Sequence, residues 1–222
     1  MKVTLLSHTF NPVGVCKEAT SICVGRKEFS TKALLSAVRS GHESVLEHAS
    51  FTFLVEGISR VTLAQLTRHR LASYSVLSQR YVDMADRETV MPHSVYQDPD
   101  LAEEWREMVE EVNDFYKRLV DLDIPSEDAR YILPEGTTAD LIMTMDAREL
   151  RHFFELRCCN RAQWEIRELA DHIFLICKHA APELFVGAGP ACVRGACRED
   201  RPCGHGRAED SLFYIEEGRM KP

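Results

Sequence analysis

The sequence lacks the glycine-rich loops that hold nucleotides in the commonest folds. Its 222 residues contain no G-x-G-x-x-G and no G-x-x-x-x-G-K-[ST] segment, which excludes the standard dinucleotide and nucleotide-triphosphate loops. It also has no G-x-S-x-G segment, the nucleophile turn of many hydrolases. A nucleotide that binds this chain must therefore be held by another fold.

Long apolar runs and an excess of positive charge are also absent. No stretch of eighteen apolar residues occurs, and the first residues, MKVTLLSHTFNPVG, are too polar for a signal peptide. We therefore expect a cytoplasmic protein without a membrane partner. The formal net charge of −8 disfavours a nucleic-acid partner, because an acidic protein repels a polyanion at long range.

The eight cysteines do not follow the pattern of a small disulfide-bonded domain. Cys158, Cys159 and Cys177 lie in helical or apolar segments and are predicted to be buried or half-buried free thiols. The C-terminal segment carries a second, polar set: Cys192, Cys197, Cys203 and His205. This set lacks a close C-x2-C pair, so we predict no metal site and keep structural zinc as the alternative.

Positive charge is concentrated in the stretch RHRLASYSVLSQRY, residues 68–81. It holds three arginines, one histidine and several hydroxyls, and no carboxylate. Closely spaced guanidinium groups repel one another, and their planar forks suit phosphate, so this stretch predicts a site for a small anion such as a nucleotide phosphate.

Local patterns predict a single α+β domain, residues 1–222, with a mixed or antiparallel sheet and a helix-rich second half. Strands are expected at 2–7 and 50–56, the second ending at Gly57, with residues 140–145 either a strand or the start of a helix. Helices are expected at 30–40, 59–68, 100–121, after Ser126, at 147–156 and at 160–179. The arginine-containing stretch is expected to begin at the end of the 59–68 helix and to continue through a serine-rich loop.

Two further clusters admit ordinary explanations. In GHESVLEH, Glu43 and Glu47 stand four residues apart, yet the segment is not the H-E-x-x-H of metalloproteases, so helix-end polarity or a ligand-lining role both remain open. In residues 146–167, Arg151 and Arg167 are expected to be exposed members of weak ion pairs. Arg157 precedes a break between helices, where a side chain can project into a cleft.

Taken together, these segments resemble the flavin-dependent thymidylate synthases. The resemblance is carried by RHR-x7-S at 68–78 and by GHES…EH, ARYILP, DAR and ELR…RAQWEIR, in the family's order, and it covers about residues 30–185. The cysteine-containing tail, residues 186–222, is outside it, and its role is left open.

The resemblance implies an enzyme that methylates dUMP to dTMP. The carbon would come from 5,10-methylenetetrahydrofolate and the reducing equivalents from NADPH, carried by bound FAD. It also implies a homotetramer whose active sites are shared between subunits.

The resemblance also implies residue roles. FAD contacts would fall at Ser44, Glu47, Arg68, His69, Arg70, Val76, Asp146, Ala147, Arg148 and His152. Contacts to dUMP would fall at Gln65, Arg68, Val76, Leu77, Ser78, Gln79, Arg80, Arg130 and Arg157. Arg157 would be the catalytic residue, because a guanidinium beside the pyrimidine stabilises the negative charge that develops there. Read without the resemblance, Arg130 is more simply a surface residue.

Three positions depart from the family's pattern. Val76 stands where an acidic or amide residue is common, and Asp146 and His152 stand where amides are frequent. These changes alter the hydrogen-bonding groups offered to FAD. Two other readings stay open at this point: a nucleotide- or RNA-binding regulator that uses the arginine cluster, and a zinc protein built on the tail.

Overall fold

The computed structural model of the protein describes residues 1–25, 27, 30–208 and 210–213. The chain divides into two compact units. Unit 1 comprises Met1–Lys2, Val55–Arg68 and Tyr74–Ile142, and unit 2 comprises Val3–Leu54, His69–Ser73 and Met143–Pro222. The expected α+β class is confirmed, while the interpretation of residues 1–222 as one domain remains a prediction.

Strands β1 (Lys2–His8), β2 (Ser50–Ser59), β3 (Ala72–Val76) and β4 (Thr138–Asp146) form one antiparallel sheet in the order β1-β2-β4-β3. The alternation that predicted β2 is real: Phe51, Phe53 and Val55 are fully buried on one face. β2 does not end at Gly57, as expected, but continues to Ser59. Gly57 adopts a φ of 71° inside the strand, and its N–H donates to Asp140 Oδ1 at 2.9 Å.

The expected serine-rich loop is wrong for residues 72–76, because β3 forms there. Half-buried Ala72, Tyr74 and Val76 alternate with exposed Ser73 and Ser75, but the alternation is short and its serines favour a loop when the sequence is read alone. The Tyr74 hydroxyl connects this strand to α3 (Arg60–Leu66) by donating to Leu66 O at 2.9 Å.

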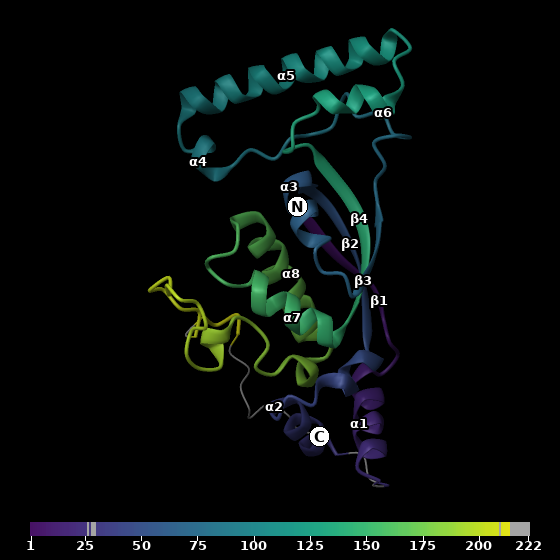
Figure 1. The fold of residues 1–222 in the computed structure, drawn as a ribbon, viewed down its shortest axis with the longest axis vertical. Coiled ribbons are helices and arrows are strands. Elements are labelled where there is room, and N and C mark those ends of the chain that lie inside the picture. Colours follow the sequence, from purple (N-terminus) through teal and green to yellow (C-terminus); the bar gives the residue numbers. More distant parts are fainter. Residues whose placement is uncertain (26, 28–29, 209, 214–222) are drawn as a thin grey trace. The chain divides into compact units, whose positions relative to one another are not determined.

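Unit 1 contains the helices α3 (Arg60–Leu66), α4 (His93–Tyr96), α5 (Pro99–Asp121) and α6 (Ser126–Ala129) and the 3-10 turn η2 (Arg130–Ile132). Asp98 caps α5 by accepting from the backbone N–H groups of Asp100 and Leu101. The short helix after Ser126 is confirmed, but Pro125 rather than Ser126 occupies its N-cap. α6 lies alongside α5 (Figure 1), and Tyr116 of α5 joins Met84 and Ala129 in a small apolar core.

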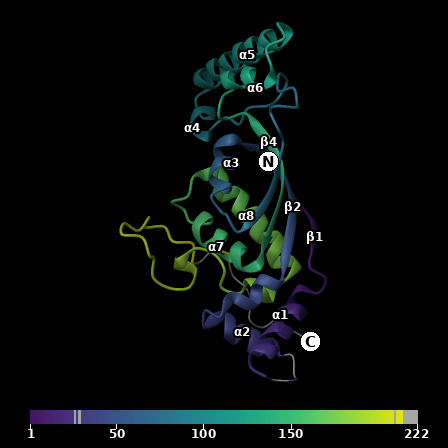
Figure 2. The same cartoon turned by 45° about the vertical axis from the view of Figure 1, so that its right-hand side comes forward.

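Unit 2 contains α1 (Pro12–Cys23), α2 (Thr31–Arg39), α7 (Ala147–Arg157) and α8 (Trp164–Ala180), with the 3-10 turns η1 (Glu43–His48), η3 (Pro182–Phe185) and η4 (Ala191–Val193). α7 and α8 pack side by side, as both views show (Figures 1 and 2). Their aromatic residues build the core of this unit: the Phe154 ring meets Phe174 edge-on at 5.1 Å and Phe185 at 5.8 Å.

The helices that carry the site begin where their caps predict. Ser30 caps α2 through the backbone N–H of Ala33, and the Asp146 carboxylate caps α7 through the N–H of Glu149 at 2.8 Å. α8 starts later than expected, at Trp164, because the Gln163 side chain accepts from two N–H groups of its first turn. Within the described residues, no helix is long and apolar enough to cross a membrane.

Candidate functional site

The chemistry-bearing residues form two groups, one in each unit. In unit 2, the imidazole of His69 lies between two side chains of α7. Its Nδ1 is 3.0 Å from Glu149 Oε1, and its Nε2 accepts from Arg157 Nε at 3.1 Å. The ring also packs edge-on against Phe153 at 5.0 Å. The sequence predicted His69 and Arg157 as site residues, but not that they touch.

His69 is neutral in this setting. It is only 4% exposed, and its burial, the positive charge of Arg157 and the neighbouring His152 together lower its pKa to about 4. A guanidinium N–H can only donate, so Nε2 must accept and Nδ1 must carry the proton. The contact with Glu149 is therefore a neutral imidazole donating to a carboxylate rather than an ion pair. Burial raises the pKa of Glu149 from its ordinary value, and the negative charge of Asp146 adds to that rise while His152 opposes it.

The other expected FAD contacts of unit 2 differ in their exposure to solvent. Ser44, Glu47, Arg70, Arg148 and His152 are exposed, Asp146 is partly exposed and Ala147 is buried. Arg148 forms a hydrogen-bonded ion pair with Glu47, which raises the pKa of the guanidinium. The Asp146 carboxylate accepts from the N–H of Glu149 and thereby caps α7, in addition to any contact that it makes with a ligand.

Arg151 corrects the sequence-based expectation. We expected an exposed, weakly paired arginine, but its side chain is only 6% exposed. It donates to Glu43 Oε1 at 2.9 Å and to the carbonyls of Leu184 and Val186, both at 3.0 Å. Arg151 therefore joins α7 to η1 and to the end of η3. Glu43 is its partner, which gives the GHES segment a structural role beside any ligand role.

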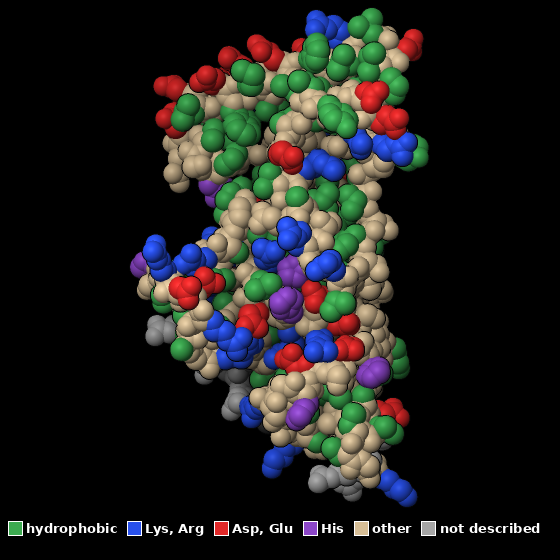
Figure 3. Space-filling model, viewed as in Figure 1, with side chains coloured by type: hydrophobic (Ala, Val, Ile, Leu, Met, Phe, Trp, Pro, Cys, Tyr) green, Lys and Arg blue, Asp and Glu red, His purple; other side chains and the backbone are tan. Residues whose placement is uncertain are grey.

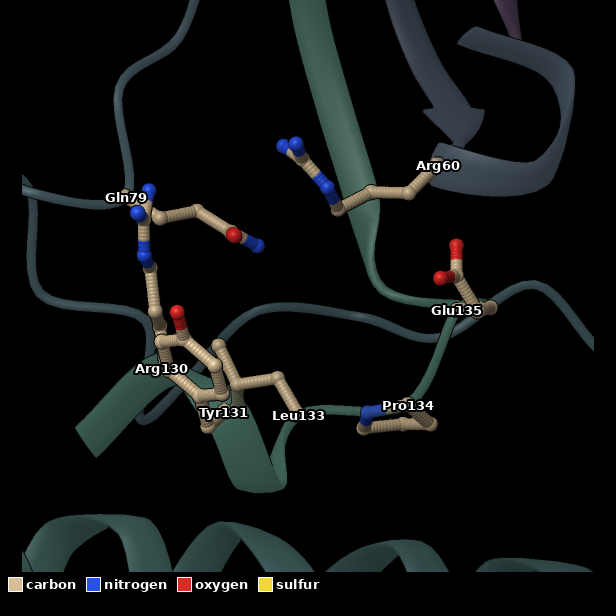
Figure 4. A pocket seen from close by; sticks show the side chains of 7 residues that line it. All are labelled: Arg60, Gln79, Arg130, Tyr131, Leu133, Pro134 and Glu135. Carbon is tan, nitrogen blue, oxygen red and sulfur yellow. The ribbon is translucent and has the colours of Figure 1, made fainter. Parts of the chain in front are cut away.

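In unit 1, a pocket of about 340 Å³ gathers residues from α3, the segment after β3, and η2. Its lining consists of Arg60, Gln79, Arg130, Tyr131, Leu133, Pro134 and Glu135. Figure 4 shows the Gln79 carboxamide and the Arg60 guanidinium reaching into the same space from two separate elements. Gln79 is 6% exposed, and its Nε2 has no hydrogen-bond partner within the described part of the chain.

An unpaired buried amide is costly unless a ligand satisfies it. Arg130 lines the same pocket, although it reads as a surface residue in isolation, and its Nε donates to Glu127 O at 3.0 Å. Arg130 and Gln79 were expected to contact substrate and do share one pocket. The remaining expected substrate residues of unit 1 are Gln65 on α3, Arg68 just beyond α3, Val76 at the end of β3, and Leu77, Ser78 and Arg80 just beyond β3.

Arg80 also corrects an expectation. The signature stretch holds no carboxylate, but Glu127, 47 residues later, lies 2.6 Å from Arg80 Nη2. Both side chains are about half exposed, so the pair is weak and can be exchanged for a ligand. In contrast, no ion pair of Arg68 or Arg70 is present within the described residues, and both are exposed.

Sequence reasoning missed three residues of these groups. Glu149 could have been suspected, because it stands three residues before His152 on the same helix. Arg60 and Glu127 gave no local signal, since each meets its neighbours only after folding. Among the described residues, one group has ligand atoms close enough together to hold a metal ion: His69, Glu149 and His152. The tail set, Cys192, Cys197, Cys203 and His205, does not form such a group.

Comparison with known proteins decides the family. The family described as "Thymidylate synthase complementing protein" matches residues 4–183. The chain belongs to this family. A relative from Geobacter sulfurreducens, named flavin-dependent thymidylate synthase, is 44% identical over 227 residues, covering 96% of this chain and 98% of that relative. A relative of the same name from Pyrococcus furiosus is 39% identical, with 90% of each chain covered. The chain is thus an enzyme of the flavin-dependent thymidylate synthase class.

A solved structure is similar in fold as well. The flavin-dependent thymidylate synthase from Helicobacter pylori, in complex with FAD and dUMP, has a TM-score of 0.71 and 25% sequence identity, and covers 85% of this chain and all of that one. These findings confirm the resemblance drawn from the signature. The non-enzymatic regulator is therefore wrong, while the absence of a metal from the tail, which lies beyond the matched residues 4–183, stays a prediction.

Proposed function

We propose that this enzyme converts dUMP to dTMP, with 5,10-methylenetetrahydrofolate as the carbon donor and NADPH as the reductant, through bound FAD. The observation that carries the proposal is the pocket of unit 1, in which two arginines and a buried, unpaired carboxamide face one space in a chain of this family. The Helicobacter pylori relative, which binds FAD and dUMP, supports the same ligands here.

The residues present fit FAD. Arg68 and Arg70 are exposed cations with no ion pair among the described residues, as a pyrophosphate requires. We assign FAD to these two arginines with Ser44, Glu47, His69, Val76, Asp146, Ala147, Arg148 and His152. FAD, when bound, supplies the redox chemistry of the reaction. Val76 offers only its backbone to a polar ligand, and Asp146 and His152 replace amides, so FAD affinity depends chiefly on the arginines.

The residues of unit 1 fit dUMP. Its phosphate is a dianion, and Arg80, the Ser78 hydroxyl and the N–H groups after β3 are suitable donors. Arg80 must exchange Glu127 for the phosphate, which costs little because that ion pair is exposed. Gln79 and Arg130 complete the substrate set with Gln65, Arg68 and Leu77. The buried carboxamide of Gln79 gains the hydrogen-bond acceptor that it lacks.

Arg157 is the proposed catalytic residue. Its guanidinium is a permanent donor at the end of α7, with its Nε held by His69. Placed against the pyrimidine edge, it stabilises the negative charge that develops on the ring as the C5 carbon becomes nucleophilic. No thiol is needed: Cys158 and Cys177 are buried, and burial raises the pKa of both thiols far above the ordinary value.

We include a homo-oligomer, a homotetramer with shared active sites, in the proposal. α5 supports it, because Leu101, Met108, Phe115 and Leu122 recur every seven residues and are 49%, 57%, 37% and 67% exposed. Figure 3 shows apolar side chains exposed on this helix at the top of the view, beside acidic ones. The eight free cysteines are consistent with a cytoplasmic location.

The visible spectrum of the purified protein tests the proposal. We expect flavin absorption, present at once or after FAD is added, that bleaches with NADPH. A colourless protein that takes up no FAD would contradict it. Arg157→Ala should keep bound FAD and lose dTMP formation by about 100-fold or more, the scale of removing one electrostatic donor. An active Arg157→Ala enzyme would remove the catalytic assignment and leave the cofactor assignment standing.

A further inference from the structure

Glu149 is a buried carboxylate to which none of the roles above has been given. It lies in the first turn of α7 and is 6% exposed. Its own N–H is fixed by Asp146, and its Oε1 meets His69 Nδ1 at 3.0 Å. Burying a carboxylate costs free energy of folding, and burial accordingly raises the pKa of Glu149. An apolar residue at this position would stabilise the fold more, so we expect the charge to have a function in its contacts.

The contact between Glu149 and His69 gives the charge a function, because it selects one tautomer of the imidazole. A neutral imidazole can carry its proton on either nitrogen, and the two tautomers offer opposite groups to Arg157. With the proton on Nδ1, Nε2 accepts the Arg157 Nε–H at 3.1 Å. With the proton on Nε2, two N–H donors would face each other. A carboxylate accepts and does not donate, so Glu149 stabilises only the first tautomer.

We propose that Glu149 is a positioning residue for Arg157, acting through His69. The carboxylate holds the proton on Nδ1, the ring of His69 presents a lone pair to the Arg157 Nε–H, and that bond sets the plane of the guanidinium. Glu149 and Arg157 are eight residues apart on one helix, and the imidazole spans the two turns between them. The inference rests on the proposed function, because it gives Glu149 a catalytic effect only if Arg157 acts on the substrate.

A cation site is the rival explanation for the same cluster. Ligand atoms of His69, Glu149 and His152 lie within 4.8 Å of one another. However, both ring nitrogens of His69 are already engaged, one by a carboxylate and one by a guanidinium. The positive charge of Arg157 beside Nε2 also repels a metal ion. The geometry therefore favours tautomer control over metal binding.

The first test reads the tautomer without any catalysis. In protein labelled with 15N-histidine, with the His69 signals assigned by their loss in His69→Gln, we expect a protonated Nδ1 and an unprotonated Nε2 at pH 7. Glu149→Gln should keep this pattern, because the amide oxygen still accepts. Glu149→Leu should shift His69 toward the Nε2–H form. An unchanged tautomer in Glu149→Leu, or a wild type already protonated on Nε2, would overturn the proposal. One equivalent of zinc that binds the wild type but not Glu149→Leu would overturn it as well.

The second test measures the effect on Arg157. Loss of an orienting partner typically lowers activity about 10-fold to 100-fold, so Glu149→Leu should lower kcat for dTMP formation on this scale. FAD content and the rate of flavin reduction by NADPH should change little, and Glu149→Gln should recover most of the loss. The exposed Glu168 of α8 provides the control: Glu168→Gln should behave as the wild type.

A double-mutant cycle distinguishes the positioning role of Glu149 from the catalytic role of Arg157. If Glu149 acts only through Arg157, adding Glu149→Leu to Arg157→Ala should cause no further loss. Additive losses would show that Glu149 acts elsewhere and would contradict the inference. Should Arg157→Ala alone stay active, the catalytic assignment of Arg157 fails instead, while the tautomer measurement still decides whether Glu149 controls His69.

Discussion

At the scale of single residues, the pair of Arg80 and Glu127 decides how the expected phosphate site is held before substrate arrives. The guanidinium is within 2.6 Å of the carboxylate, and both are about half exposed. An exposed ion pair contributes about 0–1 kcal/mol, so it preorganises Arg80 while remaining easy to replace.

This pair gives a direct prediction. Glu127→Gln should tighten dUMP binding by up to about fivefold, because Arg80 no longer exchanges a charged partner for the phosphate. Isothermal titration of dUMP into the FAD-loaded enzyme measures the dissociation constant. Asp128→Asn removes one negative charge from the neighbouring exposed residue of α6 and serves as the control. Equal affinities in the two variants would show that Glu127 does not compete with the ligand.

His69 predicts how stability depends on pH. Its folded-state pKa of about 4 lies below the ordinary value of 6.5, so the unfolded chain binds more protons between these two values. The contribution of His69 to the free energy of unfolding should therefore rise as pH increases from about 4 to 6.5, and stay constant above that. Urea unfolding at several pH values measures this, with His69→Gln as the comparison. A wild-type slope no steeper than that of His69→Gln would contradict the lowered pKa.

At the scale of elements, the sequence predicted the helices whose first turns are capped by a neighbouring side chain. α2, α5 and α7 begin at Ser30, Asp98 and Asp146 because a short polar side chain satisfies the first N–H groups, and such a cap is visible in a sequence. α1 was missed because it contains Gly14 and lacks a clear apolar stripe. β3 was missed because it is only five residues long and its serines suggest a loop, although Ala72, Tyr74 and Val76 do share one face.

Contacts that join distant segments could not be read from the sequence. His69 and Glu149 are 80 residues apart, and Arg80 and Glu127 are 47 apart. Each residue type has many potential partners, and only the packing of the elements selects one. Thus the sequence names candidate site residues one by one, and their roles stay predictions, while their mutual contacts, which set the tautomer of His69 and the pairing of Arg80, appeared only in the structure.

Arg207 holds the described part of the tail, the segment beyond η3, against the helices of unit 2. Arg207 donates to Asp171 at 2.8 Å, to Asp210 at 2.7 Å and to Cys158 O at 2.9 Å, and its guanidinium lies over the Phe213 ring at 4.7 Å. Its side chain is only 11% exposed. The described part of the tail is therefore anchored to α8 and to the end of α7.

This anchor can be tested by one substitution. Arg207→Gln leaves two carboxylates without their shared cation, which should lower the free energy of unfolding by about 2 kcal/mol or more. The midpoint of urea unfolding measures the change. Arg201→Gln, at an exposed arginine of the same segment, is the control and should shift the midpoint little. Equal midpoints for the two variants would show that the tail contributes no stability through Arg207.

At the scale of the whole molecule, the single chain leaves an apolar stripe of α5 in water. Among the described residues of α5, only Ala102 and Tyr116 are buried. Leu101, Met108 and Phe115 lie seven residues apart on another side and stay exposed. A stripe with this spacing is typical of a helix that packs against another helix, and a second copy of this chain is the partner that the proposed oligomer supplies.

The last prediction tests that partner. Met108→Glu places a charge in the middle of the stripe, and burying an unpaired carboxylate in an interface costs several kcal/mol, so the oligomer should dissociate at micromolar concentration. Light scattering coupled to gel filtration measures the molar mass.

Lys117→Glu adds a carboxylate to an exposed position of the same helix away from the stripe, and it should leave the mass unchanged. If dTMP formation falls together with the mass in Met108→Glu and rises again at higher protein concentration, assembly through α5 is required for activity. A full-size, fully active Met108→Glu enzyme would show that the subunits meet through another surface.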